Sequence, residues 1–211
     1  MIPTKDEFYK ALVDRHGADN QKKFDEAVVA ICGLGGLGSN IATCLARAGI
    51  GHLILIDYDF VDVSNLHRQQ YKINQVGMKK TDAMAANLHE INPYIKIETH
   101  NIKLTEANTK PLIEKADIVC EAFDSPESKA MLVNLVLEQM SDKYILSSSG
   151  MAGFGSANDI KTRRVSKRFY LSGDGVSDVN DGIGLISSRV MVCGAHEAHM
   201  VIKILIGELD A

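Results

Sequence analysis

AVVAICGLGGLGSNIATCLARAGIGHLILID, residues 27–57, is the stretch of the sequence that decides the fold. The apolar run at 27–31 predicts a buried strand, and the apolar run at 52–57 predicts a second one. Between them, the pattern from Ser39 to Ala48 predicts a helix, and glycines mark the turns at both of its ends. A strand, a glycine turn, a helix and a strand within about 30 residues form a βαβ unit.

The same alternation continues downstream. The expected elements are a helix at 79–91, a strand at 95–102, a helix at 105–115, a strand at 117–122, a helix at 126–140 and a strand at 144–148. Strands that alternate with helices predict an α/β fold, here a doubly wound Rossmann-like sheet with helices on both faces. The glycine-rich region after Gly150 ends in an amphipathic helix at about 189–206.

We expect a single domain over residues 1–211, because no repeat or low-complexity linker interrupts the chain. The expected parts of this domain are a polar, helical N-terminal arm at 1–26, a core at 27–150 that holds the glycine turn, and a crossover segment with the terminal helix at 151–211.

The overall composition excludes several classes of protein. A net charge of −4 and a pI of about 6.0 supply no basic field, so we do not expect a nucleic-acid partner. No apolar run reaches the roughly 18 residues of a membrane span, and the N-terminus has no apolar signal region, so we expect no membrane association and a cytoplasmic location. The cysteines are far apart and lie in apolar stretches, which is typical of reduced core thiols. They are Cys32, Cys44, Cys120 and Cys193.

The glycine turn has the composition of a phosphate cradle. Four glycines allow a tight turn and let backbone N–H groups approach a phosphate, and the following helix points its positive end at the same place. Asp57 ends the second strand, where a carboxylate can accept hydrogen bonds from ribose hydroxyls. This pattern predicts a nucleotide site but does not distinguish NAD from ATP. The alternative is that the glycines only permit close packing of helix on strand.

Several further motifs lie along the chain in a fixed order. They are GLGGLGS (33–39), LIDYDFVDVSNLHRQ (55–69), VGMKK (76–80), INP (91–93) and CEAFDS (120–125). In combination they resemble the bacterial MoeB/ThiF members of the ubiquitin-activating superfamily, which adenylate sulfur-carrier proteins in molybdopterin and thiamin biosynthesis. The resemblance covers residues 15 to about 160 and continues into the last helix. The short chain and the segment 168–190 are most similar to the ThiF branch, which acts in the thiamin pathway.

The resemblance implies an enzyme that uses ATP and Mg²⁺ to adenylate the C-terminal glycine carboxylate of a small carrier protein. Charge then develops on the phosphate oxygens, which calls for cationic donors and a metal in place beforehand. It implies that Arg68 and Lys80 contact the phosphates, that Asn65 positions them, and that Asp124 holds Mg²⁺. Arg15 resembles an arginine that family members insert into the partner subunit's site, which implies a homodimer. The expected catalytic residues are Arg68, Lys80, Asp124 and Arg15. The expected nucleotide-binding residues are Gly33, Gly35, Gly36, Gly38, Asp57, Asp59, Ser64, Asn65, Arg68, Lys80 and Asp124.

Each of these residues also has an ordinary structural interpretation. Arg68, Lys80 and Arg15 could be surface charges, and Asp57 alone could serve the ribose without Asp59. Asp124 could cap the helix that begins near Pro126.

The sequence departs from its relatives in its cysteines. It has no C-x-x-C pair, so we expect no structural zinc. Cys193 matches a packing position, so we expect the chemistry to stop at the acyl-adenylate, with sulfur supplied by another protein. His196 and His199 share one helix face, and a structural or surface role suits them better than metal binding.

The expected partner is a carrier protein with a Gly-Gly tail, and the segment 150–185 is the candidate groove and crossover for that tail. Two competing functions remain open. One is a tRNA threonylcarbamoyladenosine dehydratase of the same superfamily, for which the basic run RRVSKR (163–168) is the relevant feature. The other is an NAD-dependent oxidoreductase, which would require neither Mg²⁺ nor the cations Arg68 and Lys80.

Overall fold

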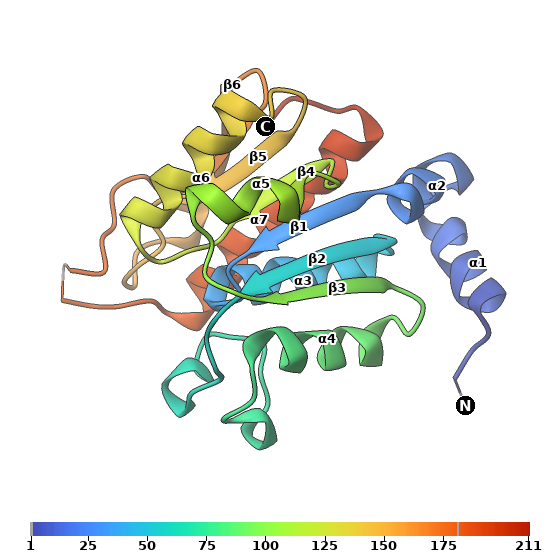
Figure 1. Cartoon of the computed structure of the whole chain (residues 1–211), viewed down its shortest axis with the longest axis horizontal. Helices are drawn as coiled ribbons and strands as arrows, with labels where there is room; N and C mark the ends of the chain where they lie inside the picture. The colour runs from blue at the N-terminus through green and yellow to red at the C-terminus, as the bar shows by residue number, and fades with distance from the viewer. Residues whose placement is uncertain (1, 181) are drawn as a thin grey trace.

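The protein is built on one sheet. The structure, a computed structural model that describes residues 2–180 and 182–211, contains seven strands in the order β3-β2-β1-β4-β5-β7-β6 (Figure 1). Neighbouring strands are parallel except β6 and β7, which form an antiparallel hairpin at one edge. The strands are β1 (Val28–Cys32), β2 (His52–Asp57), β3 (Lys96–Asn101), β4 (Ile118–Glu121), β5 (Tyr144–Ser148), β6 (Lys161–Ser166) and β7 (Phe169–Gly173).

The direction in which the sheet grows reverses at β1. The chain places β2 and then β3 on one side of β1, and then crosses over to place β4 and β5 on the other side. Open α/β sheets bind ligands outside the carboxyl ends of their strands at such a switch point. The glycine turn that follows β1 is therefore at the position in this fold where a ligand is expected.

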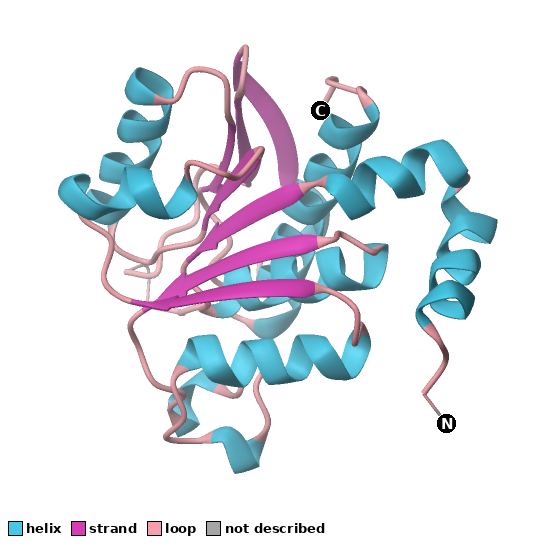
Figure 2. Ribbon diagram, turned by 45° about the vertical axis from the view of Figure 1, so that its right-hand side comes forward, coloured by secondary structure: helices cyan, strands magenta, loops and turns pink. Residues whose placement is uncertain are grey.

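Helices cover both faces of the sheet (Figure 2). Val29 and Ile31 of β1 belong to a core formed with α3, α4 and α7, whereas Ala30 and Cys32 belong to a second core formed with α5 and α6. Alternate residues of a strand point to opposite faces, so both faces of β1 are buried. The prediction of a doubly wound sheet is confirmed. The helices are α3 (Gly36–Ala48), α4 (Lys80–Ile91), α5 (Glu106–Ile113), α6 (Pro126–Gln139) and α7 (Ser187–Ile206).

The N-terminal arm consists of two helices, α1 (Lys5–His16) and α2 (Ala18–Glu26), and so has the predicted helical character. They meet at Gly17, whose φ of 80° ends α1 in a conformation that favours glycine. Thr4 and Glu7 form a capping box at the start of α1. Both helices lie beside the ends where β1 and β2 begin, and the arrowheads of β1, β2 and β3 point away from them (Figure 1).

The hairpin of β6 and β7 was not expected from the sequence. The pattern KTRRVS of β6 is exposed and charged, because β6 is an edge strand with no apolar side to bury. In β7, by contrast, Tyr170 is fully buried. Several boundaries also differ from the prediction by one to three residues; for example, α3 begins at Gly36 instead of Ser39, and α7 begins at Ser187 instead of about residue 189.

The terminal helix α7 is 20 residues long and packs along α3. The two helices approach closely at Gly194, where an added Cβ would lie 3.0 Å from the Cβ of Asn40. Within residues 2–180 and 182–211, no helix combines the length and the apolar character that crossing a membrane requires.

A buried carboxyl group lies on the inner face of α7. Glu197 is fully buried, and neither carboxyl oxygen has a hydrogen-bond partner among the described residues. Burial raises the pKa of Glu197 well above its ordinary value, and the nearby charge of Glu121 raises it further, although Lys129 acts in the opposite direction. Burial therefore favours the protonated, uncharged form of Glu197 in the folded protein.

This protonation makes stability depend on pH. The unfolded chain releases the Glu197 proton near the ordinary carboxyl pKa of 4.5, whereas the folded chain retains it, so this group lowers the free energy of unfolding as the pH rises above that value. Glu197→Gln has no proton to release. We predict that the variant gains stability over the wild type as the pH is raised from about 5 to about 8, as measured by urea unfolding. A difference between the two proteins that stays constant with pH would mean that Glu197 is ionised when folded.

Candidate functional site

The floor of the candidate site is the glycine turn at the end of β1. Gly33 has a φ of 97°, and a Cβ there would lie 2.6 Å from the carbonyl oxygen of Ala122. A Cβ on Gly38 would lie 1.9 Å from the carbonyl oxygen of Gly33. Only glycine fits at these two positions, because backbone atoms occupy the space of a side chain. The turn is thus folded back tightly against the end of β4.

The first residues of α3 fit an anionic group. The N-cap residue Gly35 provides no side-chain hydrogen bond to the first turn of the helix, and the first amides of a helix have no intrahelical partner. A Cβ on Gly35 would meet only the side chain of Gln69, at 3.9 Å, so this part of the turn is open. Free amides together with the positive end of the helix dipole form a suitable site for a phosphate.

Asp57 lies directly beside this turn. Its carboxylate is buried, with Oδ2 accepting a hydrogen bond from the Leu34 amide at 2.6 Å and Oδ1 accepting one from the Asp59 amide at 2.8 Å. Two backbone donors therefore fix its orientation. A carboxylate has about four acceptor sites, so two remain for the ribose hydroxyls that the sequence predicts as ligands.

The predicted phosphate ligand Lys80 is already held in place. It is the first residue of α4 and is only 5% exposed, and its Nζ lies 2.8 Å from Oδ2 of Asp59. The Lys80 amide also donates a hydrogen bond to the Asp59 carbonyl oxygen at 3.0 Å. The interpretation of Lys80 as an ordinary surface charge is wrong. Asp59, a predicted nucleotide ligand, is the partner of Lys80 in this structure.

Arg68 lies against the start of α3. Its Cγ is 3.4 Å from the position that a Cβ on Gly36 would occupy, so the stem of the side chain packs on the glycine turn. Its Nη1 donates to the Ser64 carbonyl oxygen at 3.2 Å and lies 2.7 Å from Nε2 of His67. Its Nε is buried and has no partner among the described residues. A buried N–H without a partner beside free helix amides fits a site that receives an anion.

Ser64 and Asn65 shape the segment that carries Arg68. They belong to a short 3₁₀ helix, Val63–Asn65, and both side chains bond to Asp62. Ser64 Oγ donates to the Asp62 carboxylate at 2.6 Å, and Asn65 Oδ1 accepts from the Asp62 amide at 3.1 Å. In this structure the two side chains therefore stabilise the turn before Arg68, and their predicted contact with the nucleotide stays a prediction.

Asp124 is exposed in the turn between β4 and α6. The N-cap of α6 is Ser125, whose Oγ accepts a hydrogen bond from the Ser128 amide at 3.3 Å, so the interpretation of Asp124 as the helix cap is wrong. Within the described residues, the Asp124 carboxylate has neither a hydrogen bond nor an ion pair, and no group of three or more metal-ligating side chains is present. A single free carboxylate suits Mg²⁺, which takes one or two carboxylates and completes its shell with phosphate oxygens and water.

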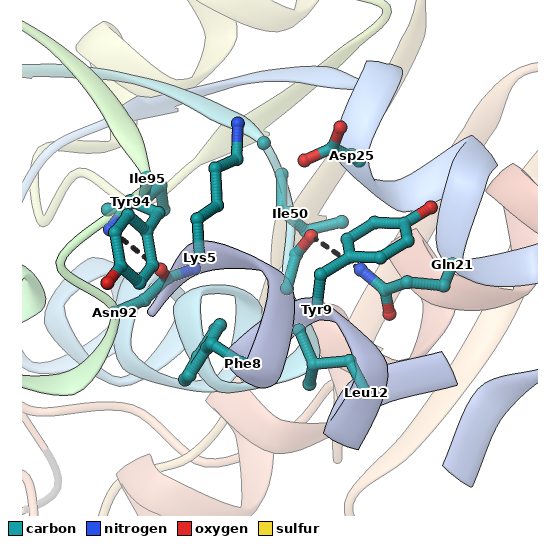
Figure 3. Close-up of a pocket in the computed structure, with 12 residues that line it drawn as sticks. Lys5, Phe8, Tyr9, Leu12, Gln21, Asp25, Ile50, Asn92, Tyr94 and Ile95 are labelled. Carbon is teal, nitrogen blue, oxygen red and sulfur yellow. Dashed lines mark hydrogen bonds between the residues drawn. The ribbon is translucent and has the colours of Figure 1, made fainter. Parts of the chain in front are cut away.

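Arg15 is not part of this site within one chain. It is an exposed residue of α1, which lies at the end of the sheet where the strands begin, whereas the glycine turn follows the other end of β1 (Figure 1). A small pocket lies beneath α1 and is lined by side chains such as Phe8, Tyr9 and Leu12 (Figure 3). Its volume of about 20 Å³ holds little more than one water molecule, so it is not a nucleotide site.

The structure also reveals a buried ion pair that the sequence did not predict. Arg189, in the first turn of α7, lies 2.7 Å from Oδ2 of Asp174 and donates to the Ala152 carbonyl oxygen. Burial raises the pKa of Asp174, but hydrogen bonds from the Ser177 and Val176 amides and from Arg189 outweigh this and hold the pKa below its ordinary value. Arg189 therefore joins two separate parts of the predicted crossover segment, at Ala152 and at Asp174, to the first turn of α7. No periodic pattern in the sequence links residues so far apart.

The cysteines are poorly placed for covalent chemistry. Cys32, Cys120 and Cys193 are buried, and Cys44 is half-buried. Burial is the main cause that raises the pKa of each of these four thiols. A thiol becomes nucleophilic as the thiolate, so burial and a raised pKa both disfavour covalent chemistry at these side chains. The prediction that Cys193 is a buried packing residue is confirmed.

Comparisons with known proteins agree with this geometry. The model of the ThiF family matches residues 9–210. The chain is similar to the "Adenylyltransferase and sulfurtransferase UBA4" of Lodderomyces elongisporus, with 32% identity over 93% of this chain and 44% of that protein. It is also similar to the "Adenylyltransferase and sulfurtransferase MOCS3" of Culex quinquefasciatus, with 32% identity over 90% of this chain and 44% of that protein. The chain thus spans less than half the length of these relatives.

A solved structure resembles the whole chain. The tRNA N6-threonylcarbamoyladenosine dehydratase TcdA of E. coli, in complex with ATP, superposes with a TM-score of 0.87 and 21% identity, and the match covers 99% of this chain and 98% of that one. At this identity the likeness establishes the fold alone, and it confirms the Rossmann-like class.

The close packing of the glycine turn yields a test. We predict that Gly38→Ala lowers the free energy of unfolding by at least about 2 kcal/mol and weakens ATP binding, because the new methyl group would displace the Gly33 carbonyl oxygen. The matched control is Gly184→Ala, where a Cβ meets no atom within 4 Å, and we expect a change within about 0.5 kcal/mol. Thermal and urea unfolding with ATP titration give both readouts. Equal free energies of unfolding for the two variants would mean that the turn at Gly38 is not tightly packed.

Proposed function

The chain belongs to the ThiF family, and from that premise we propose that it is an ATP-dependent adenylyltransferase. The proposed substrate is the C-terminal glycine carboxylate of a small ubiquitin-like sulfur carrier with a Gly-Gly tail, in the thiazole branch of thiamin biosynthesis. One observation supports the proposal above all: four groups lie together at the switch point of the sheet. They are the uncapped N-terminus of α3, the fixed carboxylate of Asp57, the buried cation of Lys80 and the unpartnered N–H of Arg68.

This set of groups suits a triphosphate better than a dinucleotide. Two cations beside one phosphate cradle would neutralise the charge that builds on a triphosphate during transfer. A dehydrogenase has no need of such a pair around a pyrophosphate. The names of the relatives, which describe adenylyltransferases, support the same choice.

The proposed reaction is a substitution at the α-phosphate. An oxygen of the carrier carboxylate forms a bond to the α-phosphorus, the bond from that phosphorus to the bridging oxygen breaks, and pyrophosphate leaves with the bonding electrons. Asp57 would hold the ribose, and Lys80 and Arg68 would donate to phosphate oxygens. When bound at Asp124, Mg²⁺ would neutralise phosphate charge. Most of the site is preorganised, because backbone contacts and burial fix Asp57 and Lys80 before any ligand arrives.

A second candidate acceptor is a carboxylate carried by tRNA. The likeness to a tRNA N6-threonylcarbamoyladenosine dehydratase over the whole chain favours it, as does the basic edge strand β6. Against it, Arg164 and Arg168 of the basic run are engaged within the chain: Arg164 donates to the Ser166 and Lys167 carbonyl oxygens and Arg168 to that of Asp142. The net charge of −4 also opposes binding to a polyanion.

The proposed adenylation predicts a carrier-dependent exchange reaction. With Mg²⁺ and a Gly-Gly-tailed thiamin-pathway carrier, the chain should catalyse ATP–pyrophosphate exchange, because adenylation is reversible until the next step consumes the adenylate. Asp124→Ala should lower the rate at least about 100-fold, the scale seen when a group that stabilises transition-state charge is removed. Exchange of radiolabelled pyrophosphate into ATP measures both.

Two controls distinguish the sulfur carrier from tRNA as the acceptor of the adenylate. A carrier truncated by its last two glycines should give no exchange. Exchange that requires modified tRNA and ignores every carrier would replace the sulfur-carrier assignment with the tRNA acceptor.

We further propose that the active protein is a homodimer in which Arg15 reaches the partner's site, since α1 lies far from the glycine turn of its own chain (Figure 1). A mixture of Arg15→Ala and Asp124→Ala subunits should then regain exchange activity of about a quarter of the wild-type value, because half of randomly formed dimers contain one intact site. Each variant alone should stay inactive. Failure of the mixture to regain activity, with subunit exchange verified by sedimentation of tagged chains, would place Arg15 outside the site.

A further inference from the structure

One buried carboxylate beside the candidate site has no role in the proposed reaction. Glu121 is the last residue of β4 and is fully buried. It precedes the turn that carries Asp124 into α6. A buried charge is costly unless hydrogen bonds and an opposite charge compensate for it, so its contacts indicate its purpose.

Glu121 binds three different parts of the chain. Its Oε1 accepts a hydrogen bond from the Phe123 amide, in the turn itself, at 2.6 Å. Lys129 of α6 donates to both carboxylate oxygens, at 3.0 and 3.2 Å. Ser147 of β5 donates to Oε2 at 2.5 Å. The carboxylate thus ties the turn after β4 to the next helix and to the next strand.

The other side of the same turn is pressed against the phosphate cradle. The Ala122 amide donates to the Cys32 carbonyl oxygen at 2.8 Å, and the Ala122 carbonyl oxygen occupies the space that a Cβ of Gly33 would fill. A Cβ on Gly38 would lie 3.2 Å from the Cβ of Ala122. Ala122 is therefore held by the glycine turn, while Phe123 is held by Glu121.

Asp124 is the next residue and has no contact of its own within the described residues to fix it. Its position depends on the two residues before it and on Ser125, which caps α6. We infer that Glu121 is a positioning residue that holds the Ala122–Phe123 turn, and through it places the Asp124 carboxylate for the metal at the phosphate cradle. This inference rests on the proposed function, in which Asp124 binds Mg²⁺.

Residues that orient a metal ligand change metal affinity when they are replaced, typically by 10- to 100-fold. A residue that only stabilises the fold would not affect metal binding selectively. The distinguishing quantity is therefore metal affinity in the presence of nucleotide, compared with nucleotide affinity in the absence of metal.

The experiment titrates Mn²⁺, a paramagnetic substitute for Mg²⁺, into the full chain saturated with ATP and follows free Mn²⁺ by electron paramagnetic resonance. Glu121→Gln retains the shape and an acceptor for the Phe123 amide but loses the charge that holds Lys129. We expect it to weaken Mn²⁺ binding about 10-fold while the affinity for ATP without metal changes less than about threefold. Glu121→Asp, which retains the charge on a shorter stem, should restore part of the Mn²⁺ affinity.

The matched control is Glu197→Gln, because Glu197 is an equally buried glutamate but makes no hydrogen bond among the described residues. This control should leave Mn²⁺ affinity unchanged. If Glu121→Gln does not fold, as judged by its thermal transition, Lys129→Met removes the ion pair in its place with the same expected result. Lys129 lies in α6 and is not among the proposed ligands.

The outcomes separate the inference from the proposed function. Unchanged Mn²⁺ affinity in Glu121→Gln, or an equal loss of ATP affinity with and without metal, overturns the inference while the adenylyltransferase proposal stands. Unchanged Mn²⁺ affinity in Asp124→Ala overturns the inference together with the assignment of Asp124 as the metal ligand, because the metal would then bind elsewhere. Loss of Mn²⁺ affinity in Asp124→Ala and Glu121→Gln, but not in Glu197→Gln, is the expected result.

Discussion

The contact between the glycine turn and the end of β4 is the constraint on which the rest of the site depends. The Ala122 carbonyl oxygen lies where a side chain on Gly33 would be, and the Gly33 carbonyl oxygen lies where one on Gly38 would be. This backbone packing holds the start of α3 against the turn after β4, and the Gly33 amide donates a hydrogen bond to the Ile56 carbonyl oxygen of β2 at 2.8 Å. The free amides, Asp57 and Asp124 come from these three segments, and the parallel pairing of β1 with β2 and β4 places them at the same edge of the sheet.

The charges of the site are arranged before any ligand binds. Asp57 is held by two backbone amides, Lys80 is buried and paired with Asp59, and the stem of Arg68 packs on the first turn of α3. A buried cation held by one carboxylate can turn to a phosphate at little cost in side-chain entropy. Donors fixed in a partly dry site act more strongly on developing charge than donors that must reorganise in water.

The fold was largely predictable from the sequence, and the details of the site were less so. Strands such as VVAIC and HLILID are buried on both faces and appear as continuous apolar runs, and the glycine turn is a local signal. The edge strand β6 gave no such signal, because it is charged and exposed. The motif resemblance marked Asp57, Lys80 and Arg68, which lie around one turn. The pairing of Lys80 with Asp59 and the contacts of Glu121 join residues distant in sequence, and no periodic pattern encodes such polar contacts.

The glycine turn with Lys80 and Arg68 should form an ATP site and not a dinucleotide site. Calorimetric titration of the wild-type chain with ATP, and then with NAD, in the presence of Mg²⁺ tests it most directly. We expect saturable binding of ATP at one site per chain, and no displacement of bound ATP by NAD. Saturable binding of NAD that excludes ATP would contradict it, since the cations would then lie around a dinucleotide pyrophosphate and not a triphosphate.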